Sequence, residues 1–167
     1  MAVRRLNHAV LYVHDLASAV EFYTTALGFE VRTEIAGQAA FLRAPGSAND
    51  HDLGLFGIGG PAIPAGAAPH VGLYHLAWEV GTLAELAEIR RALAARGALV
   101  GASDHRVSKS LYAKDPSGIE FEVMWRVPAE DWETELQQGS MIAPLDLGAA
   151  LARWGARATG AAAGSVT

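Results

Sequence analysis

The chain carries one pattern of apolar and polar positions twice. In residues 7–31, apolar residues alternate with others just after His8, which predicts a strand. Asp15 follows, a residue type that often caps the first turn of a helix. Apolar side chains then recur at helical spacing until Gly28, at Leu16, Ala19, Val20, Tyr23 and Leu27. The pattern therefore predicts a strand followed by a helix that ends at Gly28.

The second copy of the pattern occupies residues 74–100. A strand that carries His75 leads into a helix, and Gly97 ends it. In both copies, three strand-like runs follow the helix. They are residues 29–35, 38–43 and 51–56 in the first copy and 98–102, 107–113 and 119–125 in the second. The repeat predicts two β-α-β-β-β modules.

The two modules are expected to form one domain over residues 1–127. Module one covers residues 5–57 and module two covers residues 72–126, and a Gly-, Pro- and Ala-rich segment joins them. One helix covers only one face of a four-stranded sheet. We therefore predict an α+β fold in which two βαβββ modules form a curled mixed sheet, a half-open barrel, around a shared cleft.

Residues 128–167, called here the C-terminal extension, follow the predicted domain. Residues 129–138 are compatible with a helix, and residues 144–155 have the pattern of a short amphipathic helix. The last residues, TGAAAGSVT, are mostly small, so a flexible tail is expected.

Composition excludes several classes of function. The net charge of -5 and the absence of a basic stripe argue against nucleic acid as a partner. The chain contains no Cys, which excludes disulfides and thiolate metal sites and suits a reducing compartment. No apolar run is long enough for a membrane span, and the start lacks a signal-peptide cleavage site. We expect a cytoplasmic protein that does not enter a membrane.

A run near the end of module two points to a known family. The segment HRVSKSLYAKDPSGIEFE, residues 105–122, resembles the signature of extradiol ring-cleaving dioxygenases. The matching positions are His105, Leu111, Tyr112, Asp115, Pro116, Gly118 and Glu122. Over residues 5–126 the chain resembles the vicinal oxygen chelate superfamily, which includes glyoxalases, bleomycin-resistance proteins and these dioxygenases. The resemblance implies a homodimer that acts on a small molecule.

The resemblance also implies a metal site. In this superfamily the ligands come from the first and last strands of the modules, and the matching residues are His8, His75 and Glu122. Gly54 follows His8 at nearly the same distance in the sequence as Glu122 follows His75. Glycine has no side chain that could bind a metal. Glu120 shares a strand face with Glu122 and competes with it on spacing alone, but the family motif favours Glu122.

Two imidazoles and one carboxylate leave about three positions open on an octahedral ion, the arrangement of non-haem Fe(II) oxygen activation. The resemblance therefore implies an Fe(II)-dependent extradiol dioxygenase that cleaves a catechol-like substrate with O2. Mn, Ni, Zn or Co are the other candidate metals. Two alternatives stay open: a glyoxalase-like isomerase, epimerase or lyase, and a metal-free drug-binding protein.

Three further residues match catalytic positions of the extradiol enzymes. His51 matches a proton-handling histidine, while His105 and Tyr112 match residues that hydrogen-bond the substrate. A strict strand would place His51 and Gly54 on opposite faces. Either His51 precedes the regular strand, or a bulge intervenes, or the assignment is wrong.

Strand alternation adds two candidate substrate-binding residues. Ser108 and Ser110 share a face with Tyr112, and two hydroxyls beside a phenol suit a polar substrate. The nearby segment 115–118, Asp-Pro-Ser-Gly, is predicted to be a tight turn only.

Overall fold

The computed structural model describes residues 3–68, 71–155 and 157–158. The flexible tail expected over the last residues, 159–167, lies outside them. Contacts divide the chain into two compact units. Unit 1 comprises Met1–His70 with Asp115–Ile119, and unit 2 comprises Val71–Lys114 with Glu120–Thr167.

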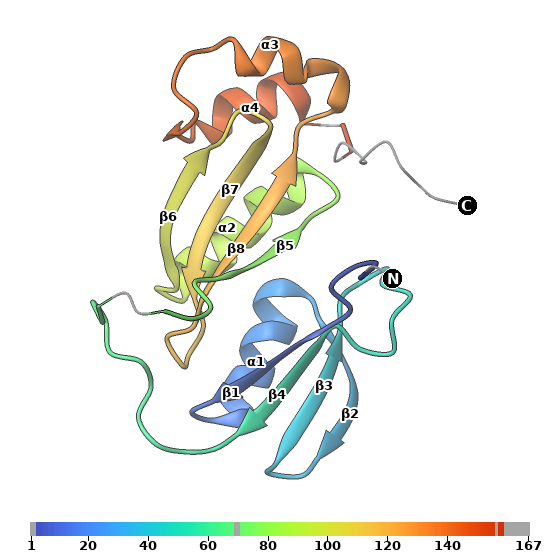
Figure 1. The fold of residues 1–167 in the computed structure, drawn as a ribbon, viewed down its shortest axis with the longest axis vertical. Coiled ribbons are helices and arrows are strands. Elements are labelled where there is room, and N and C mark those ends of the chain that lie inside the picture. The colour runs from blue at the N-terminus through green and yellow to red at the C-terminus, as the bar shows by residue number, and fades with distance from the viewer. Residues whose placement is uncertain (1–2, 69–70, 156, 159–167) are drawn as a thin grey trace. The chain divides into compact units, whose positions relative to one another are not determined.

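Unit 1 contains one mixed four-stranded sheet and one helix (Figure 1). Its elements are β1 (Ala9–Val13), α1 (Leu16–Leu27), β2 (Glu30–Ile35), β3 (Ala39–Arg43) and β4 (Leu53–Gly57). The strand order is β1-β4-β3-β2, with β1 parallel to β4 and the other pairs antiparallel. This is the β-α-β-β-β order that the sequence predicts.

Unit 2 repeats this order. Its elements are β5 (Leu76–Glu79), α2 (Leu83–Ala95), β6 (Leu99–Asp104), β7 (Ser108–Lys114) and β8 (Glu120–Arg126). The sheet order is β5-β8-β7-β6-β9, and β5 runs parallel to β8. The predicted α+β class is confirmed, with two mixed sheets that are not closed into a barrel.

Capping residues at the ends of the helices explain where α1 begins and ends and where α2 begins. Asp15 caps α1, because its Oδ1 accepts a hydrogen bond from Ser18 N at 2.7 Å. Gly28 ends α1 with a φ of 75°, a left-handed conformation that glycine adopts without steric cost. Thr82 and Glu85 form a capping box at the start of α2. In the described part of the chain, no helix has the length and hydropathy that a membrane crossing requires.

Each sheet buries one face under its helix and leaves the alternate positions on what we call its open face. The buried side chains of unit 1 include Leu11, Val13, Leu42, Leu53 and Leu55, and those of unit 2 include Leu111, Phe121, Val123 and Trp125. Because successive strand residues point to opposite sides, the residues between them lie on the open faces. Gly54 on β4 and the candidate site residues on β7 and β8 are among these.

The described part of the C-terminal extension belongs to unit 2. It contains a 3-10 turn (Ala129–Asp131), α3 (Trp132–Leu136), β9 (Ala143–Pro144) and α4 (Leu147–Trp154). Strand β9 pairs with β6 and so adds a fifth strand, while α4 contacts α2. The ring centroids of Trp154 and Trp125 are 5.8 Å apart, so α4 also covers the end of the buried core.

Candidate functional site

Unit 2 brings together two of the three predicted metal ligands. His75 directly precedes β5, and Glu122 lies on the neighbouring strand β8. His75 Nε2 is 3.1 Å from Glu122 Oε2, and the two side chains are 24% and 13% exposed. His75 Nδ1 is buried and has no hydrogen-bond partner among the residues that the structure describes. An imidazole nitrogen and a carboxylate oxygen that converge in this way are a donor pair suited to a divalent ion.

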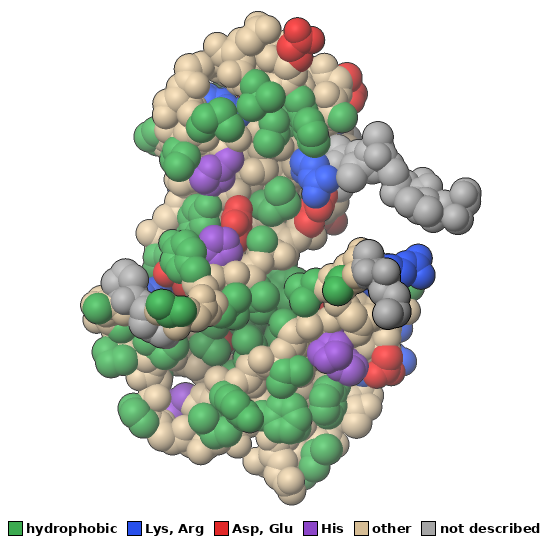
Figure 2. Space-filling model, viewed as in Figure 1, with side chains coloured by type: hydrophobic (Ala, Val, Ile, Leu, Met, Phe, Trp, Pro, Cys, Tyr) green, Lys and Arg blue, Asp and Glu red, His purple; other side chains and the backbone are tan. Residues whose placement is uncertain are grey.

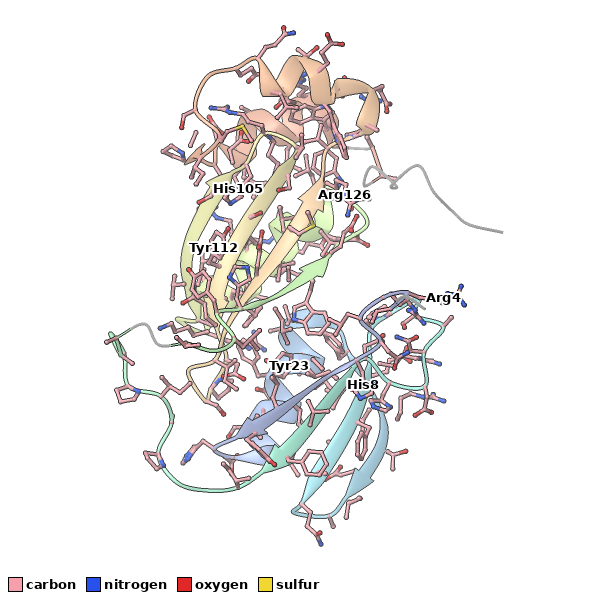
Figure 3. All side chains as sticks on the ribbon, in the orientation of Figure 1. Arg4, His8, Tyr23, His105, Tyr112 and Arg126 are labelled. Atoms are coloured by element: carbon pink, nitrogen blue, oxygen red, sulfur yellow. The ribbon has the colours of Figure 1, made fainter. Side chains whose placement is uncertain are left out.

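Tyr112 and His105 lie beside this pair. Tyr112 is the direct cross-strand partner of Glu122, and its ring centroid is 5.8 Å from that of His75. The Tyr112 hydroxyl is 2.7 Å from His105 Nε2, and Figure 3 shows both side chains. Burial and the Glu122 charge raise the pKa of Tyr112 above its usual value. The phenol therefore stays protonated at neutral pH.

The two serines lie on the open face of β7 with Tyr112. Ser108 is the cross-strand partner of Arg126, and Ser110 is the partner of Met124. Ser110 is fully buried, whereas Ser108 is half-buried. Their alternation is as expected, but a role in substrate binding stays a prediction.

Glu120 has different partners from Glu122. Its carboxylate forms a hydrogen bond with the hydroxyl of Tyr74, which raises the pKa of that phenol. Lys114 Nζ lies 3.9 Å from Glu120 Oε2. The carboxylate that meets His75 is therefore that of Glu122, the residue that the family motif favours.

Unit 1 places two further histidines side by side. His51 precedes β4, so the first of the three explanations for its spacing from Gly54 holds. The ring centroids of His8 and His51 are 4.7 Å apart. Nδ1 of His8 lies 2.8 Å from Asn7 Oδ1, and Nδ1 of His51 lies 2.9 Å from Asp50 Oδ2. Both rings are thus held through Nδ1.

The open face around Gly54 is apolar. Gly54 pairs with Val10 on β1 and with Phe41 on β3. A Cβ built at Gly54 would lie 3.4 Å from Val10 Cγ2 and 3.6 Å from Phe41 Cδ1, which is ordinary contact. The Phe41 ring also contacts His51 and Phe56, with centroids 5.1 Å and 5.9 Å apart. Figure 2 shows hydrophobic side chains gathered on this face of unit 1.

Neither unit alone assembles the predicted three-ligand site. Within each unit, the described residues include no cluster of three His, Asp or Glu side chains that could hold a metal ion. His75 and Glu122 belong to unit 2, and His8 belongs to unit 1. The pair in unit 2 is observed, and the participation of His8 stays a prediction.

The segment after β7 has a role that the sequence reasoning missed. It forms the predicted turn, but Asp115 is also buried and accepts hydrogen bonds from the N–H groups of Ser117 and Ile119, both at 2.9 Å. The hydroxyl of Tyr23 in α1 donates to the same carboxylate at 3.2 Å. Burial raises the pKa of Asp115. A tyrosine on the buried face of α1 was the available signal, since a buried phenol usually finds a partner.

Comparisons with known proteins identify the family of the chain. A family model described as the Glyoxalase/Bleomycin resistance protein/Dioxygenase superfamily matches residues 5–123. The catechol-2,3-dioxygenase of Bacillus subtilis (strain 168) is 28% identical over 137 residues, which cover 82% of this chain and 46% of that protein. Biphenyl-2,3-diol 1,2-dioxygenase 3 of Rhodococcus globerulus is 31% identical over 115 residues, which cover 68% and 59%. The chain thus spans about half the length of these relatives.

Solved structures share the fold at low identity. A glyoxylase/bleomycin resistance protein/dioxygenase domain from Frankia sp. EAN1pec gives a TM-score of 0.63 at 20% identity, covering 80% of this chain and 99% of that one. A lactoylglutathione lyase from Agrobacterium tumefaciens gives 0.54 at 24% identity, covering 74% and 95%. These likenesses concern the fold and leave the reaction open.

Proposed function

Since the chain belongs to the Glyoxalase/Bleomycin resistance protein/Dioxygenase superfamily, we propose that it is a metal-dependent dioxygenase of the extradiol type. Such an enzyme opens the ring of a catechol-like substrate with O2. The observation that carries the proposal is the convergence of His75 and Glu122, combined with a glycine at the corresponding place in unit 1. The dioxygenases among the relatives support it.

In this proposal, His8, His75 and Glu122 hold one divalent metal. His8 and His75 occupy the same place in their units, just before the first strand. His75 would bind through Nε2, the nitrogen that faces Glu122. His8 would also bind through Nε2, because Asn7 engages its Nδ1.

The metal that suits this donor set best is Fe(II). Two imidazoles and one carboxylate as the protein ligands would leave coordination positions for a chelating diol and for O2. When bound, the ion supplies a Lewis acid for the diol and a route for electrons between diol and oxygen. Mn, Ni, Zn and Co bind the same donors and are the alternatives.

The chain's own residues would orient the substrate and move protons. Tyr112 keeps its proton at neutral pH, so its hydroxyl is a hydrogen-bond donor for a substrate oxygen. His105 is hydrogen-bonded to that hydroxyl and would exchange a proton with it. His51, whose Nδ1 is tied to Asp50, would act as the second proton-handling group.

The apolar face of unit 1 favours an aromatic substrate. Phe41, Phe56 and Tyr12 offer ring surfaces that suit the ring of a catechol better than a charged peptide conjugate. A homodimer that acts on such a small molecule is part of the proposal.

The alternatives within the superfamily fit these observations less well. A glyoxalase-like isomerase or lyase would hold its metal through four protein ligands. Gly54 occupies the position of the fourth ligand and has no side chain that could bind a metal. A drug-binding protein without metal has no need for an imidazole and a carboxylate at 3.1 Å.

Oxygen consumption tests the proposal. Protein purified without oxygen and loaded with Fe(II) is mixed with catechol or 3-phenylcatechol, while an oxygen electrode and the visible spectrum are followed. We expect oxygen uptake together with a yellow ring-opened product. Metal-loaded protein that consumes no oxygen with any catechol, but isomerises a glutathione hemithioacetal, would establish the lyase alternative instead.

A further inference from the structure

We propose that the C-terminal extension orients His105, with Lys109 and Glu135 as positioning residues. The inference rests on the proposed function in one respect, the proton-handling role given to His105. It is carried by the contacts that connect the extension to the turn between β6 and β7, all of which lie in unit 2.

The turn that carries His105 has a strained backbone. His105 N donates to Ser108 O at 2.9 Å and closes a tight hairpin. Arg106, the next residue, has a φ of 67° and is the only non-glycine residue with a positive φ in the described part of the chain. Backbone of this kind persists where surrounding contacts enforce it, and it concentrates at functional sites.

The C-terminal extension supplies some of the contacts that hold the backbone of this turn. Arg106 is buried, and its Nε donates to the carbonyl oxygen of Ser140 at 2.6 Å. Its backbone N–H donates to Asp104 Oδ1 at 2.7 Å. Asp104 in turn pairs with Ala143 of β9. The residues on either side of His105 are therefore both attached to the extension.

Lys109 supplies the second attachment. It lies on the buried face of β7 and is 1% exposed. Its ammonium group donates to Asp104 Oδ1 at 2.7 Å, Arg106 O at 3.1 Å and Glu135 Oε2 at 3.2 Å. Since an ammonium group has three N–H donors, this set uses all of them.

Glu135 connects Lys109 to the helices of the extension. It lies in α3 and is 1% exposed. Its Oε1 accepts from Arg153 Nη1 at 2.6 Å and from Gln138 Nε2 at 2.7 Å. Charged hydrogen bonds thus run from α4 through Glu135 and Lys109 to the carbonyl of Arg106.

This network differs from apolar packing because its hydrogen bonds are directional. Leu111 and Ala113 fill the same buried face of β7 with apolar atoms. A buried ion pair is seldom more stabilising than apolar residues of similar volume, but its hydrogen bonds have fixed directions. Here those directions converge on the two neighbours of His105, whose Nε2 lies 2.7 Å from the Tyr112 hydroxyl.

The test measures His105 directly in the full-length, metal-free protein. Imidazole ¹H and ¹⁵N signals are recorded by NMR, and the His105 signals are assigned with a His105→Asn variant. In Lys109→Met and Glu135→Gln we expect the His105 signals to shift or broaden, while those of His51 in unit 1 stay in place. In the active enzyme, the same variants should lower kcat about 10-fold with little change in KM.

A matched control separates positioning from general destabilisation. Asp146→Ala removes the capping hydrogen bond of α4, in which Asp146 Oδ1 accepts from Ala149 N at 2.9 Å; this bond stabilises the extension and involves neither Lys109 nor Glu135. Its His105 signals should match the wild type. If a single variant fails to fold, the double variant Lys109→Met/Glu135→Leu replaces both buried charges with apolar groups.

Two outcomes would overturn the inference. His105 signals that are unchanged in Glu135→Gln would show that the network does not hold the turn. Equal changes in Asp146→Ala would show only a general effect of the extension. Because these spectra need no metal, oxygen or substrate, a wild-type protein that cleaves no catechol would refute the proposed function without deciding this result.

Discussion

Unit 1 and unit 2 share their order of elements and their strand register, but their open faces differ in chemistry. In unit 1, Gly54 lies between Val10 and Phe41. In unit 2, Glu122 lies at the corresponding place, between Ala77 and Tyr112. We call each of these sets of three cross-strand partners a row. Unit 2 thus has a carboxylate where unit 1 has a glycine, and a phenol where unit 1 has a phenyl ring.

In the proposed function, this difference would let one repeated fold serve two tasks. His8 and His75 each precede the first strand of their unit, so one imidazole is kept in both copies. Only unit 2 adds a carboxylate and a hydroxyl next to it. In the proposed function, unit 2 would be the polar half that binds metal and moves protons, and unit 1 the apolar half that accommodates a ring.

Removing the carboxylate of unit 2 should have the largest effect. In Glu122→Ala the row becomes apolar as in unit 1, and we expect metal affinity to fall on the order of 100-fold or more. Competition with a chromogenic chelator measures this. Glu120→Ala is the control, and its affinity should stay within a few-fold of wild type. Full affinity in Glu122→Ala would refute the ligand assignment.

Replacing the phenol should affect the reaction but not the metal. Tyr112→Phe makes the row resemble that of Phe41, and kcat for ring cleavage should fall about 100-fold, because a positioned proton donor is lost. Metal content should stay unchanged. Tyr74→Phe removes a phenol with a different partner and serves as the comparison. Equal kcat values in Tyr112→Phe and wild type would contradict the assigned role.

Adding a carboxylate to unit 1 should make the two rows alike. Gly54 leaves ordinary contact distance for a Cβ, so Gly54→Glu is expected to fold. The new carboxylate would occupy an open metal position, lowering oxygen uptake about 10-fold while metal is retained. Gly54→Ala controls for the added volume. If Gly54→Glu consumes oxygen as fast as Gly54→Ala, the glycine does not mark an open position.

The smallest effect concerns the stability of unit 1. Tyr23→Phe removes one donor to the buried Asp115 carboxylate and should cost about 1–2 kcal/mol at neutral pH, measured by urea unfolding. Tyr12→Phe is the control, since Tyr12 is 70% exposed.

The pH dependence of this cost has a definite sign. Burial raises the pKa of Asp115, so its contribution to stability is fully present below the unfolded pKa of roughly 3.9 and is lost as pH rises through the folded pKa. The Tyr23 hydroxyl lowers that folded pKa. The cost of Tyr23→Phe should therefore grow from acid to neutral pH, and a cost that is constant across this range would contradict the account.

Local signals explain why the order of elements could be predicted from the sequence. Asp15 and Gly28 bound α1 as expected, because capping and the left-handed conformation depend on the residues themselves. The alternation in β7 likewise placed Ser108, Ser110 and Tyr112 on one face. Such features need no knowledge of distant parts of the chain.

Features that depend on distant partners could not be predicted in this way. Asp115 looked like a turn residue, because its partner Tyr23 lies 92 positions away in the sequence. Strand alternation indicates which face of β7 Lys109 occupies. It does not indicate that the carboxylate of Glu135 pairs with the Lys109 ammonium group. Tyr74, whose hydroxyl binds Glu120, carries no motif at all. The choice of Glu122 over Glu120 came from the family resemblance and not from spacing.

The most direct test of the central claim is the iron content of single-histidine variants reconstituted without oxygen. If His8, His75 and Glu122 share one ion, the wild type and His51→Ala should each bind a single Fe(II) per chain. His8→Ala and His75→Ala should then lose most of it. A His8→Ala protein that keeps its full iron content would contradict the account.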